Sequence, residues 1–181
     1  MMQLSERTLG DWLEHWAATT PDKEYIVYSD RNLRFTWKQF NERVDNLAKG
    51  LLSIGVEKGT HVGIWARNVP DWLTFLYACA KIGAVAVTVN TNYKQAELEY
   101  LCQNSDMHTL CIVDGEKDSS FVDMMYTMLP ELKTFQRGHL KSKRFPYMRN
   151  VIYIGQEKYR GMYNTAEILL LGKNIDDEKL E

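Results

Sequence analysis

Residues 61–113 decide the fold of this chain: HVGIWARNVPDWLTFLYACAKIGAVAVTVNTNYKQAELEYLCQNSDMHTLCIV. Short apolar runs of strand length alternate here with longer segments whose apolar residues recur every three or four positions. Strands and helices that alternate over short loops form a largely parallel sheet with helices on both faces. The predicted fold class is therefore α/β, with a doubly wound sheet. The expected strands cover 61–66, 84–89 and 109–113, and the expected helices cover 70–83 and 94–104.

Individual residues within this stretch predict the burial of one strand, the start of one helix and the buried face of another. The unbroken apolar run 84–89 is typical of a strand that is covered on both faces of the sheet. Asn68 and Pro70 supply an N-cap and an early proline for the helix that follows them. The buried face of the next helix is expected to be formed by Ala96, Tyr100 and Leu101.

Two further helices are marked by capping signals in the N-terminal part. Thr8 and Asp11 stand three positions apart, as in a capping box, ahead of apolar residues at helical spacing. Thr36 and Gln39 repeat this arrangement before an amphipathic helix that ends near Gly55.

Other segments add a hairpin and a weaker C-terminal pattern. Two β-prone runs, 25–28 and 33–35, flank the turn-forming residues 29–32, which predicts an N-terminal β-hairpin. Beyond Asp114 the periodicity is less regular. It predicts a helix over 119–129, a strand over 151–154 and a helix over 165–171.

Composition limits the classes of partner and compartment. The chain has 181 residues and a formal net charge of -2, so a general electrostatic attraction to nucleic acid is not expected. No apolar run approaches the roughly 18 residues of a membrane span, and the first ten residues show no signal-peptide pattern. Three cysteines in apolar contexts are typical of buried thiols in a reducing compartment. These features predict a cytoplasmic chain.

Residue chemistry alone identifies no catalytic set and no metal site. Gly172 and Lys173 do not complete a phosphate-binding loop, because the glycine and the Ser or Thr that such a loop requires are absent from its other positions. The spacing of Cys102, His108 and Cys111 fits no common zinc pattern. Asp30 and Asp114 follow strand-like runs and are interpreted as turn residues. Tryptophans, Trp65 among them, are interpreted as core residues.

A basic stretch over residues 131–150 is the most unusual segment. It is expected to be a mobile, solvated loop, because its cations repel one another and it has no apolar periodicity. The alternative is contact with RNA or a nucleotide phosphate through the basic and interleaved aromatic side chains. The basic residues are Lys133, Arg137, Lys141, Lys143, Arg144 and Arg149.

Several local motifs occur in an order that resembles a known family. The motifs are TLxxW (8–12), TPDK (20–23), RFTWxxF (34–40), LLSIGVxKG (51–59), NxPDW (68–72), IGAV (82–85) and VNTxYKxxELxY (89–100). Together they resemble the N-terminal region of the AMP-forming acyl-CoA synthetases, in the adenylate-forming superfamily. The resemblance covers residues 8–114 well and the remainder loosely.

This resemblance implies a two-step ligase in the parent enzyme. A carboxylate, in this family often that of a fatty acid, attacks the α-phosphate of ATP, and coenzyme A then displaces AMP. ATP, Mg²⁺ and coenzyme A are the cofactors and substrates that the family implies. The family's Ser/Thr/Gly-rich phosphate loop does not occur here, nor do its later acidic segment and its C-terminal domain. The chain is thus expected to be part of a larger domain, to have no catalytic or metal-binding residue of its own, and to bind no cofactor alone.

Two positions remain as candidates for ligand contact through the resemblance. In the family, the loop after the strand over 84–89 borders the coenzyme A channel, and a basic side chain there can meet a phosphate. Asn92 stands where some relatives carry Arg, and Lys94 is the nearest remaining cation. A plain surface lysine at a helix terminus is the alternative interpretation of Lys94.

Two functional hypotheses follow. The first is an inactive N-terminal scaffold of an acyl-CoA ligase, whose partner is the remainder of that enzyme. The second is a complete, non-enzymatic α/β binding or interaction module. The first also predicts self-association, because a sheet separated from its neighbouring half exposes apolar surface.

Overall fold

A five-stranded parallel sheet forms the centre of the molecule, which the computed structural model describes over residues 6–115 and 120–180. The strand order is β4-β3-β5-β6-β7. The chain therefore adds β4 on one side of β3 and then adds β5, β6 and β7 in turn on the other side. All four neighbouring pairs are parallel. The strands are β3 (His61–Trp65), β4 (Val85–Thr88), β5 (Thr109–Ile112), β6 (Asn150–Tyr153) and β7 (Tyr163–Asn164).

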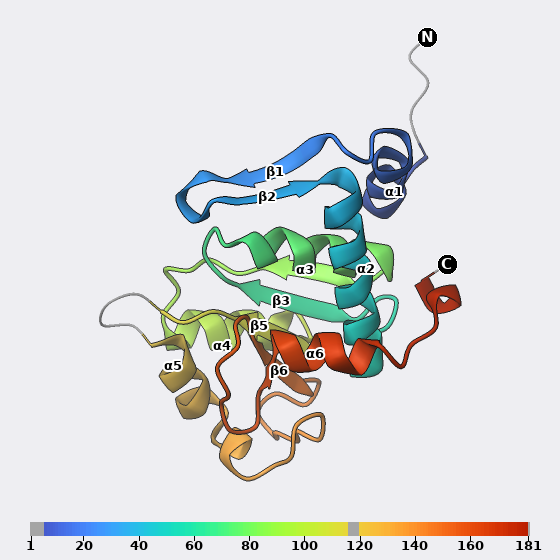
Figure 1. Cartoon of the computed structure of the whole chain (residues 1–181). Helices are drawn as coiled ribbons and strands as arrows, with labels where there is room; N and C mark the ends of the chain where they lie inside the picture. The colour runs from blue at the N-terminus through green and yellow to red at the C-terminus, as the bar shows by residue number, and fades with distance from the viewer. Residues whose placement is uncertain (1–5, 116–119, 181) are drawn as a thin grey trace.

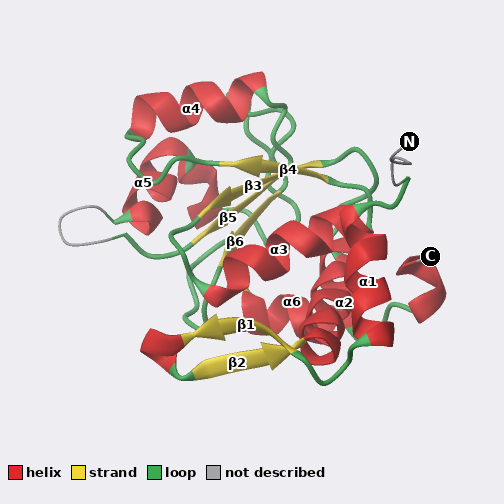
Figure 2. Ribbon diagram, turned by 90° about the horizontal axis from the view of Figure 1, so that it is seen from above, coloured by secondary structure: helices red, strands yellow, loops and turns green. Residues whose placement is uncertain are grey.

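Helices cover both faces of this sheet (Figures 1 and 2). One face carries α2 (Trp37–Ser53), α3 (Pro70–Lys81) and α6 (Thr165–Gly172), with α1 (Leu9–Thr19) packed on α2 and α3. The other face carries α4 (Gln95–Asn104) and α5 (Phe121–Met128). The predicted doubly wound α/β fold is therefore confirmed. Among the residues that the structure describes, no helix is long and apolar enough to cross a membrane.

The predicted hairpin forms a separate two-stranded sheet. β1 (Glu24–Tyr28) and β2 (Leu33–Thr36) pair in antiparallel fashion, and a short 3-10 helix, η1 (Ser29–Arg31), joins them. Asn32 completes the turn in the left-handed region with φ of 49°, which asparagine tolerates better than most residues. Tyr25 of β1 stacks on Trp37 of α2 at 3.7 Å, so aromatic packing attaches the hairpin to the helical layer.

Both predicted capping boxes are present. The Thr8 hydroxyl accepts from the Asp11 amide at 3.1 Å, while the Asp11 carboxylate accepts from the Thr8 amide at 2.7 Å. Thr36 and Gln39 make the same reciprocal pair at the start of α2. These contacts satisfy amides that have no partner inside the helix, which is why the two starts could be located from the sequence.

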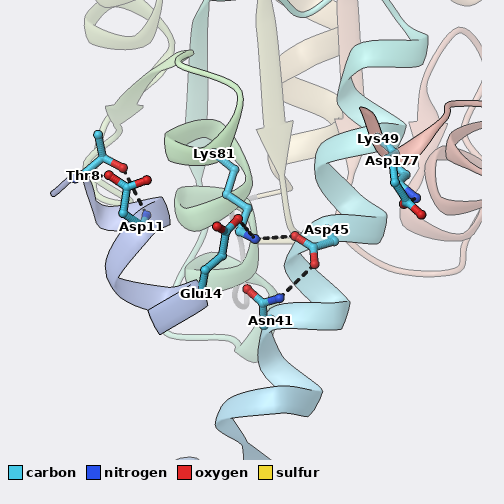
Figure 3. A network of polar contacts seen from close by, with 8 residues as sticks. All are labelled: Thr8, Asp11, Glu14, Asn41, Asp45, Lys49, Lys81 and Asp177. Atoms are coloured by element: carbon cyan, nitrogen blue, oxygen red, sulfur yellow. Dashed lines mark hydrogen bonds and ion pairs between the residues drawn. The ribbon is translucent and has the colours of Figure 1, made fainter. Parts of the chain in front are cut away.

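A buried lysine ties three helices together (Figure 3). Lys81, at the end of α3, has a side chain that is only 3% exposed. Its Nζ donates to Glu14 of α1 at 2.8 Å and to Asp45 of α2 at 2.5 Å. Asp45 also accepts from Asn41 Nδ2 at 2.9 Å. The cation therefore lies where the three helices meet.

The prediction that residues 84–89 form a fully covered strand is wrong. β4 is the outermost strand, paired only with β3, and the Val85 side chain is 43% exposed. Figure 2 looks onto this edge of the sheet. The apolar run correctly indicated a strand, but its place in the sheet depends on which strands pair, and that is a long-range property.

Two local predictions about α3 and α4 are also corrected. Pro70 does open α3, but the N-cap is Val69 and no side chain caps that end. In α4 the buried residues are Leu98, Glu99 and Cys102, while Tyr100 is 70% exposed. The predicted face was wrong for Ala96 and Tyr100, which are exposed, whereas Leu101 is half-buried and packs against the core.

The C-terminal region follows the weaker predictions with one addition. β6 and α6 form close to the expected positions, and α5 begins after Ser120, whose hydroxyl accepts from the Asp123 amide. Ser119 of the predicted helix lies outside the described residues. The strand β7 was not predicted, since two residues are too few to show a period. The last described residues form a 3-10 helix, η3 (Asp177–Leu180).

The basic stretch is irregular but not solvated throughout. After η2 (Pro130–Lys133) it buries Leu140, Phe145 and Met148. Two of its cations have carboxylate partners while staying largely exposed: Arg144 pairs with Glu99, and Arg137 lies 2.5 Å from Glu167. The prediction of a solvated loop is wrong for Leu140, Phe145 and Met148, because single apolar residues without periodicity can still reach the core.

The mobility of the basic stretch stays a prediction, which we now restrict to residues 140–147. No amide from 140 to 147 donates a hydrogen bond to another residue in the described part of the chain. The amides of Val85 and Val89, in contrast, donate to carbonyls of β3 and the residue before it. We expect hydrogen exchange near the unprotected rate over 140–147 and strong protection at Val85 and Val89. Strong protection across 140–147 would contradict this.

Candidate functional site

The carboxyl ends of β3, β4 and β5 lie at one edge of the sheet. Because the three strands are parallel and adjacent, the loops that follow them leave from the same edge. The chain leaves β3 toward β4 through α3 and leaves β4 toward β5 through α4, and these helices lie on opposite faces (Figure 2). Loops that diverge in this way are where ligands bind in open α/β sheets. This edge is therefore the candidate site.

The loop after β4 is held in place by a buried tryptophan. Trp65, the last residue of β3, donates from its indole Nε1 to the Asn90 carbonyl at 3.2 Å. The Asn90 side chain in turn accepts from the Asn92 amide at 2.9 Å, and the Asn90 carbonyl accepts from the Tyr93 amide at 3.1 Å. The loop is thus a compact turn whose shape depends on the indole beneath it.

Asn92 and Lys94 both lie exposed on this loop. The Lys94 amide donates to the Glu97 carboxylate at 2.6 Å, which caps the start of α4. Lys94 is exposed and makes no ion pair within residues 6–115 and 120–180. The structure therefore places both sequence-predicted residues at the candidate edge, with a cation that a phosphate could reach.

An arginine at the same edge was missed by the sequence analysis. Arg67 follows β3 and donates to the carbonyl of Asp114, which follows β5, at 3.3 Å. The signal was available, because Arg67 lies directly after a predicted strand. The Asp114 carboxylate accepts from the Gly115 amide at 2.8 Å, and its interpretation as a turn residue stays a prediction. Asp30 lies in the hairpin turn, in the other sheet.

Buried aromatic packing supports the edge from below. The rings of Trp65 and Phe121 stack at 3.7 Å with an interplanar angle of 5°, and both side chains are buried. The prediction that the tryptophans are core residues is confirmed for Trp65 but is wrong for Trp16, which is 39% exposed. Because the Trp65 indole also holds the loop, this residue links the core to the candidate site.

The cysteines and His108 are not part of a reactive centre. Burial raises the pKa of Cys79 and of Cys102 to about 12, and it raises the pKa of Cys111 well above the ordinary value. Such thiols stay protonated and unreactive near neutral pH. His108 lies before β5, at the opposite edge from the candidate site, and burial followed by the Arg149 charge lowers its pKa. In the described residues no group of three or more His, Cys, Asp or Glu side chains could hold a metal ion.

The arrangement at the edge is therefore suited to contact with an anion. It presents an exposed lysine and an arginine on well-supported loops, but the described residues include no paired acid and base and no activated nucleophile.

Comparison with known proteins identifies the class to which this fold belongs. A family model described as AMP-binding enzyme matches residues 13–145, which is most of the chain. The chain belongs to this family.

Particular relatives narrow the family further. The Bacillus subtilis (strain 168) protein YngI, whose name places it provisionally among the acyl-CoA synthetases, is 44% identical over the whole chain, which covers 33% of YngI. The bovine medium-chain acyl-CoA ligase ACSF2, a mitochondrial protein, is 35% identical over 84% of this chain and 25% of its own length. The chain thus spans a third or less of these two relatives.

Solved structures show the same fold. The anthranilate CoA ligase AuaEII, in complex with anthranoyl-AMP, matches 91% of this chain with a TM-score of 0.74 and 20% identity, over 28% of its own chain. The long-chain-fatty-acid-CoA ligase FadD1 of Archaeoglobus fulgidus matches 97% of this chain with a TM-score of 0.71 and 21% identity, over 31% of its own chain.

Proposed function

We propose that this chain is the N-terminal scaffold of an ATP-dependent acyl-CoA ligase and is inactive alone. The observation that carries the proposal is the alignment with YngI, which extends over the entire chain at 44% identity yet covers only 33% of that protein. The proposed reaction of the whole enzyme joins a carboxylic acid, in our view a fatty acid, to coenzyme A. ATP is cleaved to AMP and pyrophosphate.

The structure supports a scaffold role through its packing. Two layers of helices enclose the sheet, and the Trp65 indole fixes a loop that bears an exposed cation. We propose that Lys94 and Asn92 border the channel by which coenzyme A approaches in the whole enzyme. Lys94 would attract a phosphate, whereas Asn92 offers a hydrogen bond without charge.

Location and assembly are part of the same proposal. Three buried, unpaired cysteines support a reducing compartment, and we place the protein in the cytoplasm. At the open edge of β4, Val85 is exposed and the strand carries no charged residue. Edges of this kind pair readily with other strands, which supports self-association of the chain when it is alone.

The function is tested by ATP–pyrophosphate exchange. We expect the 181-residue chain to show none with any fatty or aromatic acid, because the groups that would hold the triphosphate are not in its sequence. The full-length protein, assayed in parallel, should show acid-dependent exchange. Exchange by the chain alone would contradict its inactivity, and a full-length protein without exchange would favour the non-enzymatic binding module.

The proposed role of Lys94 is tested in the full-length protein. Lys94→Gln should raise KM for coenzyme A by about tenfold, the effect of one lost charge contact, while ATP–pyrophosphate exchange stays unchanged. The matched control is Lys38→Gln, another exposed lysine, in α2. If the two variants had equal KM values for coenzyme A, the proposed contact would be contradicted, and Lys94 would be an ordinary surface lysine at a helix terminus.

A further inference from the structure

The outer edge of β4 is a row of backbone groups without partners. The amides of Val85 and Val89 donate to carbonyls on the β3 side, at 2.8 and 3.1 Å. Because the N–H and C=O groups of successive strand residues point to opposite sides in alternation, Ala86 and Thr88 direct theirs away from β3. In the described part of the chain, no group donates to or accepts from these backbone atoms. Each of the two residues therefore offers one donor and one acceptor at the edge.

The sequence around this edge lacks the features that normally prevent a strand from pairing. No charged residue and no proline occurs between Lys81 and Lys94. The pairing of β4 with β3 runs from Val85 to Thr88 without a bulge. Charges, prolines and bulges are common means of protecting an edge strand. The edge of β4 is therefore open to another strand.

A second copy of β4 fits this edge when a two-fold axis relates the two strands. In antiparallel pairing, opposed residues that exchange two hydrogen bonds alternate with opposed residues that exchange none. An axis at Val87 places Ala86 opposite Thr88 of the second copy, and Thr88 opposite Ala86 of the second copy. Every outward N–H then meets a carbonyl oxygen of opposite partial charge. The edge of β4 is thus complementary to itself.

The side chains of the strand permit this approach. Ala86 is small and would lie opposite the exposed Thr88 of the second copy. Val87 would lie opposite its own counterpart in a non-hydrogen-bonded pair, where Cα atoms are about 4.5 Å apart and β-branched side chains pack well. Like charges, which destabilise opposed residues, are absent from β4. The self-complementary backbone therefore meets no opposing charge.

We propose that two copies of this chain form a dimer by antiparallel pairing of β4 with β4, which joins the two sheets into one. The contact uses the same residues of both copies, so it closes at two copies. The inference rests on the self-association in the proposed function and names its interface. It does not depend on the ligase reaction, and the variants below distinguish a wrong interface from an absence of self-association.

Disulfide cross-linking of the 181-residue chain by oxidised glutathione tests the register. Val87→Cys should give a covalent dimer, because an axis at this residue brings the two Cα atoms within the roughly 4.4–6.8 Å that a disulfide requires. Val85→Cys is the matched control, since its position is more exposed but the two Cα atoms would lie about 14 Å apart. We expect Val87→Cys to cross-link at least about tenfold faster. The native cysteines are buried with raised pKa values and should not react.

Sedimentation equilibrium tests the strand edge itself. The unmodified chain should show a monomer–dimer equilibrium with a Kd below about 1 mM. Ala86→Pro removes an outward amide and none that bonds to β3, so it should raise Kd by at least about tenfold. Val85→Lys should also raise Kd, because a lysine on an edge strand opposes pairing.

The control for the lysine variant is Val27→Lys in β1, because Val27 is 45% exposed and Val85 is 43% exposed. This control should leave Kd unchanged, and circular dichroism melting confirms that each variant folds. A chain that stays monomeric at about 1 mM would overturn both self-association and its interface. A dimer that Val27→Lys weakens as much as Val85→Lys, or that cross-links equally fast through Val85→Cys and Val87→Cys, would overturn the β4 interface alone. Assemblies larger than a dimer would overturn the closed two-fold contact.

Discussion

Replacing Gly50 with alanine will destabilise the fold by about 2–3 kcal/mol, although alanine is the better helix former. Gly50 lies in α2 where this helix crosses α6. A Cβ atom at this position would lie 2.5 Å from Ile168 Cγ2 and 2.6 Å from the Ile168 carbonyl oxygen. Backbone cannot rotate away as a side chain can, so the two helices would have to separate. The cost of that overpacking exceeds the propensity gain of up to about 1 kcal/mol.

Urea denaturation measures this effect, with Gly10→Ala in α1 as the matched control. A Cβ atom on Gly10 would meet nothing closer than Lys81 Cγ at 3.3 Å, which is a much milder contact than those at Gly50. We expect the free energy of unfolding of this control to change little or to rise. Gly172→Ala should resemble Gly50→Ala, since its Cβ would lie 2.6 Å from the Gly50 nitrogen. Unchanged stability in both crossing variants would show that α2 and α6 do not approach so closely.

Replacing Lys81 with methionine will lower the free energy of unfolding by about 2 kcal/mol. Methionine keeps most of the apolar stem but removes the cation that Glu14 and Asp45 share. The Asp45 side chain, 28% exposed, then remains partly buried without its partner. Removal of one member of a fully buried pair costs about 3–5 kcal/mol, and solvent access to both carboxylates reduces that here.

Two further variants separate charge from packing. Lys49→Met removes the partner of Asp177, whose side chain is 91% exposed, and should cost at most about 1 kcal/mol. The double variant Lys81→Met/Asp45→Asn should recover part of the loss, because the unpaired carboxylate is then gone. If Lys81→Met were as stable as the unmodified chain, the lysine would not be an important link among the three helices.

Local patterns explain why much of the fold could be predicted from the sequence. Thr8 and Thr36 cap their helices through residues three positions away, so the whole interaction lies within a few residues. The hairpin turn depends on Ser29 to Asn32 in the same way. The alternation between strand-like apolar runs and helix-like spacing of apolar residues is equally local, and it correctly predicted the parallel sheet. Asn92 and Lys94 could be placed at a strand's carboxyl end for the same reason.

Long-range packing decided the features that the sequence did not predict. Arg67 and Asp114 are 47 residues apart and meet only because β3 pairs with β5. A surface groove of about 830 Å³ likewise joins Phe135 to Leu170 through the order of strands and the position of α6. Lys81 is buried because α1, α2 and α3 meet around its side chain. The spacing of residues within α3 alone does not predict this burial.

The amino-acid sequence by itself determined the α/β class, the helix starts, the hairpin and the resemblance to acyl-CoA synthetases, since each depends on neighbouring residues or on motif order. The tertiary structure alone decided that β4 is an edge strand, that Phe145 and Met148 of the basic stretch are buried, and that cations and leucines share a groove. The physical reason is that burial and pairing are properties of segments distant in the chain. Their free energies appear only when those segments meet.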